Sequence, residues 1–135
     1  MADRQIVKEW LNRAEEDFDF AAANLKEENE FYAQICFHFH QSAEKYLKAF
    51  IVAYDLEFEK LHNLMNLAKI CARKESSILK IIDECGFLNA AYIDSRYPVQ
   101  WPTDYTREKA LKAKEAAYAI AEVIKELLKK GGYAD

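Results

Sequence analysis

Helix-breaking residues are nearly absent from this chain. Its 135 residues include only three glycines and two prolines, and most of these lie near predicted breaks in the chain. Long stretches without them favour helices, which need an uninterrupted ladder of backbone hydrogen bonds. No repeat, low-complexity tract or linker divides the sequence. Residues 1–135 are therefore predicted to form a single all-α domain.

Composition limits the classes of protein to which the chain can belong. Hydrophobic residues make up 51% of it and charged residues 31%, which is too apolar for a disordered chain. The net charge of −4 argues against a general polyanion binder but allows a local basic stripe. No apolar run approaches the ~20 residues that span a bilayer, and residues 1–10 lack the features of a signal peptide. Three cysteines without a CxxC pair are typical of buried thiols, so we expect a cytoplasmic protein without membrane contact.

Apolar residues at three- and four-residue steps predict three long helices. They cover residues 3–26, 30–54 and 107–130. Asn29 is the expected N-cap of the second helix and Thr106 that of the third, which Gly131 and Gly132 end.

Shorter helices are predicted between the second and third long ones. The first carries Leu64 to Cys71, the next begins at Ser76 or Ser77 and is closed by Gly86, and a brief one follows over residues 87–93. Pro98 and Pro102 predict an irregular stretch over residues 96–104. The whole pattern predicts an up-and-down bundle of four or five helices.

The second long helix is apolar around most of its circumference, which predicts a central position in the bundle or burial in an oligomer. The remaining surface is a narrow polar strip, formed by Gln34, His38, Gln41, Ser42, Lys45 and Lys48. We expect this strip to line a groove or a subunit boundary.

The motifs that commonly hold metals or phosphates are missing. His38 and His40 are two residues apart, about 200° around a helix, so they cannot chelate one ion together. There is no HExxH pattern and no glycine-rich loop before a helix. We therefore expect neither a metal nor another cofactor.

Two groups of residues could instead bind an anion. Lys45 and Lys48 on the polar strip could meet a phosphate, although two lysines on one helix face are more commonly only solvated. Arg96 and Tyr97 could offer a planar cation and a phenol to an anionic ligand or RNA base. The alternative is that Arg96 pairs with Asp17 or Glu44 while Tyr97 packs. Nothing resembles a nucleophile triad or a paired-carboxylate site.

Four short motifs follow one another along the chain. They are Ala14–Phe18 (AEEDF), Gln41–Ala49 (QSAEKYLKA), Lys60–Leu64 (KLHNL) and Ser95–Pro98 (SRYP). Their combination resembles the HEPN domain family over about residues 7–128. The resemblance implies a helical bundle that pairs as a homodimer. It also implies either an RNA-cleaving toxin or a nucleotide-binding protein, often encoded beside a minimal nucleotidyltransferase.

The nuclease branch of that family uses an arginine followed by a histidine four to six residues later. None of the five arginines here has a histidine at those distances. Without that imidazole, the general acid–base step lacks its usual agent. The resemblance therefore favours binding over RNA cleavage by that motif.

Carried over residue by residue, the family pattern predicts one polar pocket. Its members are Asp17, Gln41, Glu44, Lys45, Lys48, His62, Arg96 and Tyr97. The resemblance implies that the lysines and Arg96 meet phosphates and that Asp17 and Glu44 orient them, while His62 contacts the ligand or caps the third predicted helix. We expect a dimeric nucleotide-binding module. It is a possible partner of a separately encoded nucleotidyltransferase in a toxin–antitoxin-type pair. The alternatives are a ribonuclease with a dispersed site and a purely structural dimeric interaction module.

Overall fold

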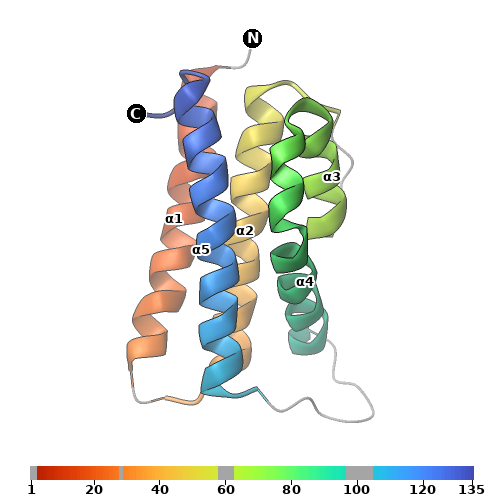
Figure 1. The fold of residues 1–135 in the computed structure, drawn as a ribbon. Coiled ribbons are helices and arrows are strands. Elements are labelled where there is room, and N and C mark those ends of the chain that lie inside the picture. Colours follow the sequence, from red (N-terminus) through yellow and green to blue (C-terminus); the bar gives the residue numbers. More distant parts are fainter. Residues whose placement is uncertain (1–2, 28, 58–62, 97–104) are drawn as a thin grey trace.

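The structure, a computed structural model, describes residues 3–27, 29–57, 63–96 and 105–135 (Figure 1). These residues form α-helices and one 3₁₀ segment, without strands. The elements are α1 (Arg4–Lys26), α2 (Tyr32–Ala53), α3 (Leu64–Lys74), η1 (Ser76–Ile81), α4 (Ile82–Arg96) and α5 (Arg107–Lys130). The prediction of an all-α bundle is confirmed.

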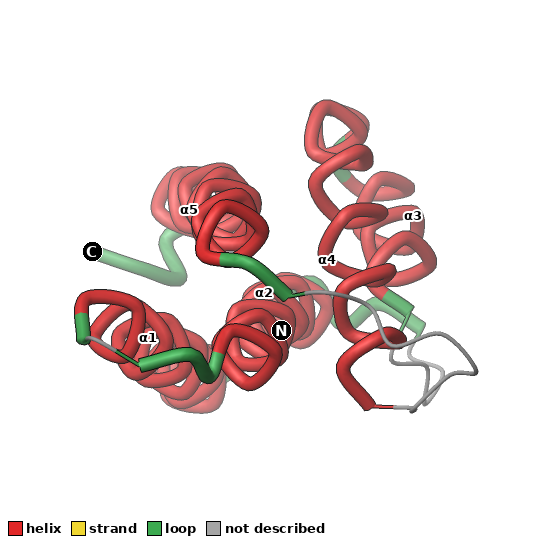
Figure 2. Tube along the Cα trace, turned by 90° about the horizontal axis from the view of Figure 1, so that it is seen from below, coloured by secondary structure: helices red, strands yellow, loops and turns green. Residues whose placement is uncertain are grey.

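Helix α2 occupies the centre of the bundle. Figure 2 shows α1 and α5 on one side of it and α3 and α4 on the other, and α2 packs against all four. More than half of its residues are buried, among them Phe39, Leu47 and Phe50. A helix with so broad an apolar surface must be covered on several sides. The predicted central position is confirmed.

Alanines bring the flanking helices close to α2. Ala14 and Ala21 of α1 and Ala113 and Ala117 of α5 have no exposed surface. A methyl group at these positions lets helix backbones approach, while the larger side chains of α2, such as Phe39, fill the space between them.

Side chains cap most of the helices. Asp3 accepts a hydrogen bond from the backbone N–H of Gln5, and Asn63 accepts two at the start of α3. Thr106 accepts from Lys109 at 3.1 Å, so the cap predicted for the last helix is confirmed. That helix ends at Gly131, followed by Gly132 with a φ of +83°, in the left-handed region that favours glycine.

Three of the predicted helix ends are wrong. Helix α2 begins at Tyr32 with Phe31 at the N-cap position, and Asn29 instead accepts a hydrogen bond from the Phe31 N–H at 3.2 Å. Asn29 therefore orders the turn without capping the helix.

The other two errors concern η1 and α4, and the brief helix predicted over residues 87–93 is part of α4. Glu75, not Ser76 or Ser77, caps η1 by accepting from the Ser77 N–H. Gly86 lies inside α4, because Cys85 and Leu88 on either side of it are buried in the core and hold the helix together. Packing outweighs the modest cost of a glycine within a helix.

None of the helices in the described ranges is both long and apolar enough to cross a membrane.

Candidate functional site

The carboxylate of Asp17 in α1 links two side chains of α2. Its Oδ2 accepts a hydrogen bond from Lys45 Nζ, and its Oδ1 lies 3.5 Å from His38 Nδ1. His38 and Lys45 are seven residues apart, so two turns of α2 separate them along one face. All three side chains are partly buried. The structure thus brings together an anion, a cation and an imidazole from two helices.

A second ion pair lies one turn further along α2. Lys48 Nζ is 3.3 Å from Glu44 Oε2, and their side chains are only 13% and 4% exposed. The Lys48 ammonium also lies 5.9 Å from the ring centre of Trp10 in α1. A charge this well buried needs an opposite charge close by, which explains the pairing. We call Asp17, His38, Gln41, Glu44, Lys45 and Lys48 the α1–α2 charged site.

Two members of the predicted polar strip have other surroundings. Ser42 is fully buried, and its hydroxyl donates to the Ala14 carbonyl of α1 at 2.7 Å. It therefore joins the two helices and is unavailable to a ligand. Gln41 is partly buried, and its Oε1 lies 3.2 Å from Nδ1 of His40.

Sequence reasoning missed the position of His40. Its side chain is fully buried and stacks on Tyr92 of α4, with ring centres 4.2 Å apart. The alternation of phenylalanine and histidine over residues 37–40 was the available signal, because such rings on a central helix must contact neighbours on several sides.

The other predicted site residues cannot be located. His62 and Tyr97 lie outside the described residues, and Arg96 ends α4 with a side chain that the structure does not describe. Of the five others, Asp17 and Lys45 pair across the α1–α2 contact, Glu44 and Lys48 pair within α2, and Gln41 contacts His40.

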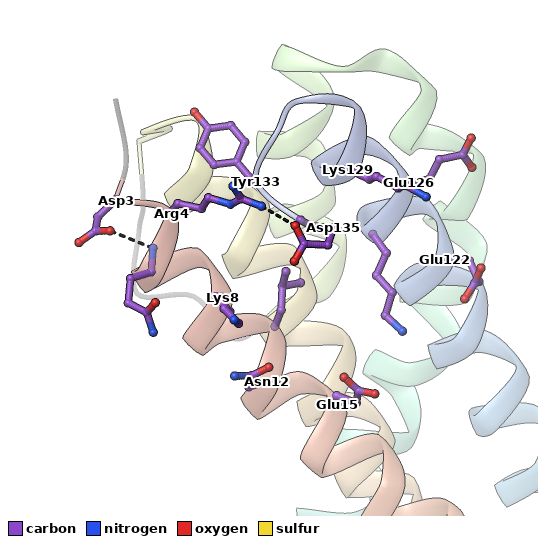
Figure 3. A pocket seen from close by; sticks show the side chains of 14 residues that line it. Asp3, Arg4, Lys8, Asn12, Glu15, Glu122, Glu126, Lys129, Tyr133 and Asp135 are labelled. Carbon is purple, nitrogen blue, oxygen red and sulfur yellow. Dashed lines mark hydrogen bonds and ion pairs between the residues drawn. The ribbon is translucent and has the colours of Figure 1, made fainter.

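A large cavity formed by described residues lies elsewhere, between α1 and α5. This α1–α5 groove encloses about 1150 Å³. Figure 3 shows Lys8, Asn12 and Glu15 of α1 on one side and Glu122 and Lys129 of α5 on the other. None of the described residues of the predicted pocket lines it. Sequence periodicity gave no sign of it, because its side chains occupy ordinary solvated positions on both helices.

The groove is charged, with both signs present. Arg4 and Asp135 form an ion pair of 2.6 Å at its upper end, with 61% and 93% of their side chains exposed. Its lysines and glutamates alternate along α5.

All three cysteine thiols are buried. Burial raises the pKa of Cys36 to about 11 and the pKa values of Cys71 and Cys85 to about 12, so all three thiols stay protonated at neutral pH. Within the described part of the chain, no three histidine, cysteine or acidic side chains are grouped to hold a metal ion.

Four α-helices pack around a central α2, with charged side chains at the contact between α1 and α2, so the domain is an all-α helical bundle. The sequence profile described as the HEPN domain matches residues 7–127. The chain belongs to the HEPN domain family.

Individual relatives agree with this assignment. A protein of Methanocaldococcus jannaschii named "Putative toxin MJ1304" is 27% identical, over 93% of this chain and 90% of its own length. The crystal structure of TT1696 from Thermus thermophilus superposes with a TM-score of 0.78 at 26% identity, covering 89% of this chain and 96% of that one. ST0689, an archaeal HEPN homologue, has the same fold, with a TM-score of 0.73 at 24% identity over 90% and 97% of the two chains.

Proposed function

We propose that this HEPN domain binds the phosphate groups of a nucleotide or RNA at the α1–α2 charged site. The observation that carries the proposal is the bridging of Lys45 and His38 by Asp17, with the Glu44–Lys48 pair beside it. Charged side chains cost free energy when they are partly buried, and these are held in fixed positions by contacts between two helices. Such fixed cations bind an anion with less loss of side-chain entropy than mobile surface lysines do.

Each residue of the site has a distinct role in this proposal. Lys45 and Lys48 contact phosphate oxygens while Asp17 and Glu44 hold the ammonium groups in place. Gln41 supplies a neutral amide beside them. In this proposal Arg96, His62 and Tyr97 are further ligand contacts, as the family resemblance implies.

We further propose that the protein acts as a toxin-type partner of a separately encoded nucleotidyltransferase in the cytoplasm. The support is the relative described as a toxin, which matches over nearly its whole length. Co-expression with the nucleotidyltransferase of the same operon should yield a complex in size-exclusion chromatography. Elution of the two proteins in separate peaks would contradict this partner.

A homodimer is the proposed assembly. Large apolar side chains that include Leu111 and Tyr118 of α5 are exposed in the single chain, and pairing would cover such surface. Light scattering should give twice the mass of the chain. The mass of one chain at micromolar concentration would contradict the dimer.

Thermal unfolding with a panel of nucleotides tests the binding. A ligand at 100 times its dissociation constant adds about 2.7 kcal/mol to the free energy of unfolding, which raises the Tm by several degrees. Lys45→Gln should abolish this shift, because glutamine keeps a hydrogen-bonding group beside Asp17 but has no charge.

A matched variant separates the two candidate sites. Lys129→Gln removes a cation from the α1–α5 groove and should leave the shift unchanged. If Lys129→Gln abolishes the shift and Lys45→Gln does not, the ligand binds in the groove and the proposal is wrong.

One observation favours a second function, RNA cleavage at a dispersed site. The Nδ1 atom of His38 is buried, makes no hydrogen bond within the described residues and lies 3.5 Å from Oδ1 of Asp17, while 31% of the side chain is exposed. A carboxylate behind an imidazole is the arrangement that orients a general base. In this reaction Nε2 accepts the 2′-hydroxyl proton and the 2′-oxygen attacks the adjacent phosphorus. The bond from phosphorus to the 5′-oxygen breaks, that oxygen takes a proton from water, and Lys45 stabilises the charge on the phosphate.

This activity is tested with a fluorescent single-stranded RNA in the presence of EDTA. Cleavage should leave a 2′,3′-cyclic phosphate and should disappear in His38→Asn. Equal cleavage by the wild type and His38→Asn would show that His38 is not the base.

A further inference from the structure

Aromatic rings from three helices form a continuous row beside the α1–α2 charged site. The row consists of Phe20, His38, Phe37, Tyr92 and His40, with successive ring centres 4.6, 5.3, 5.8 and 4.2 Å apart. Phe20 belongs to α1, Tyr92 to α4 and the other three to α2, which lies between those helices (Figure 2). We call this set the aromatic row.

Exposure increases along the row toward α1. His40 is fully buried, Tyr92 and Phe37 are partly buried, and His38 is 31% exposed. Phe20, at the outer end, is 53% exposed although it is a large apolar side chain. The edge-on contact with His38, with an interplanar angle of 61°, orients the Phe20 ring and leaves part of it open to solvent. The row thus ends in an ordered aromatic surface.

This aromatic end adjoins the charged site. His38 belongs to both, because its ring contacts Phe20 and faces the carboxylate that also binds Lys45. Because Nδ1 of His38 and Nζ of Lys45 lie against the same carboxylate, the two atoms are less than about 10 Å apart, a span of no more than about three nucleotides of a stacked strand at 3.4 Å each. A cation for phosphates and a surface for a base therefore lie within reach of one short strand.

We propose that Phe20 and His38 form a stacking platform for an unpaired nucleobase, so that the ligand of the charged site is single-stranded nucleic acid. This inference rests on the proposed function, since it extends the phosphate site. Every base offers a flat π-face, and stacking on an aromatic ring is therefore tolerant of sequence. Bases within a duplex are already stacked and paired, so the platform selects unpaired strands over duplexes.

Fluorescence anisotropy with three labelled 2′-O-methyl RNA ligands tests the platform. They are a single-stranded decamer, the same decamer with abasic nucleotides, and its duplex. The 2′-O-methyl groups prevent cleavage, and the abasic strand keeps the backbone charge. The base-bearing strand should bind the wild type about ten-fold more tightly than either of the others, as expected from loss of one or two base stacks.

Variants test whether Phe20 causes the difference in affinity between the base-bearing and abasic strands. Phe20→Ala should weaken binding of the base-bearing strand about ten-fold and leave the abasic strand unchanged. Phe31→Ala is the matched control, because Phe31 is 60% exposed in the turn before α2 and belongs to no ring pair of the row. Lys45→Gln should weaken the binding of both strands equally.

The outcomes separate the platform from the phosphate site. Equal, Lys45-dependent binding of the base-bearing and abasic strands would leave the phosphate site intact and overturn the platform. Absence of binding by every strand would overturn both. Light scattering of Phe20→Ala should give the wild-type mass, and a lower mass would assign Phe20 to a subunit contact and overturn the platform.

Discussion

Two ion pairs of the same kind occur in this protein at the same sequence spacing. Glu44 and Lys48 in α2, and Glu126 and Lys130 in α5, are both glutamates followed four residues later by a lysine. The charged atoms are 3.3 Å apart in the first pair and 3.5 Å apart in the second. Judged from the sequence and the local geometry, the pairs are equivalent.

Their surroundings differ almost completely. The side chains of Glu44 and Lys48 are 4% and 13% exposed, whereas those of Glu126 and Lys130 are 67% and 72% exposed. Water screens the outer pair, and each of its ions would be well solvated without the other. The inner pair has little access to water, so each charge depends on its neighbours. Position in the bundle, more than the pair itself, determines its energetic importance.

The largest predicted effect follows from removing one glutamate at a time. Glu44→Ala should lower the free energy of unfolding by about 3 kcal/mol, because it leaves a buried ammonium without its carboxylate. Glu126→Ala should change it by less than about 0.5 kcal/mol. Urea unfolding at neutral pH measures both. Equal losses would show that burial does not distinguish the pairs.

A double variant serves as the control. Glu44→Leu combined with Lys48→Met should recover most of the loss, since apolar residues of similar size often replace a buried pair without cost. If the double variant is as unstable as Glu44→Ala, a packing defect explains the loss better than an isolated charge does.

Protonation offers a second comparison, between one thiol buried in the folded protein and the same thiol exposed in the unfolded chain. Burial raises the pKa of the Cys71 thiol from an ordinary value of 9.0 to about 12. Above pH 9 the unfolded chain therefore loses this proton while the folded chain keeps it. The contribution of Cys71 is fully present below pH 9 and is lost as the pH rises from there toward 12, by up to about 1.4 kcal/mol per pH unit.

Urea unfolding between pH 8 and pH 10.5, with a reductant present, measures this effect. Cys71→Ala should start from a lower stability and then fall less steeply than the wild type. Parallel curves for the two proteins would mean that the Cys71 thiol ionises equally readily in both states.

The hydrogen bonds of two serines differ in burial too, with a smaller expected difference in the free energy of unfolding. Ser42 is buried and donates to the Ala14 carbonyl across the α1–α2 contact, whereas Ser77 is exposed and donates to Glu75 nearby. Ser42→Ala should cost about 1 kcal/mol and Ser77→Ala less than about 0.5 kcal/mol. Thermal unfolding of both variants checks the order, and a larger loss for Ser77→Ala would reverse the argument.

The smallest effect is expected at the end of the α1–α5 groove. Arg4→Ala removes the ion pair with Asp135, whose side chain is 93% exposed. The free energy of unfolding should change by less than about 0.5 kcal/mol, and the difference should disappear in 1 M salt. A loss above 1 kcal/mol that persists in salt would show that the C-terminal residues stabilise α1 by packing.

Much of the candidate site could be predicted from the sequence, but its pairings could not. The polar strip on α2 follows from helical periodicity, and the family resemblance groups Asp17 with it. Glu44 is adjacent to Lys45 in the sequence, yet Lys45 pairs with Asp17, 28 residues away, and Glu44 pairs with Lys48. Adjacent residues on a helix point in directions about 100° apart, so chain proximity does not bring their charges together.

The sequence by itself determined the helices, the central position of α2 and the family of the protein. These depend on periodicity, on scarce helix breakers and on short motifs, all of which act locally along the chain. The tertiary structure alone decided that Ser42 and His40 are buried, that α4 continues through Gly86, and that Phe20 stays at the surface beside His38. Those outcomes depend on which helix covers which face, and that is settled only when residues distant in the chain pack together.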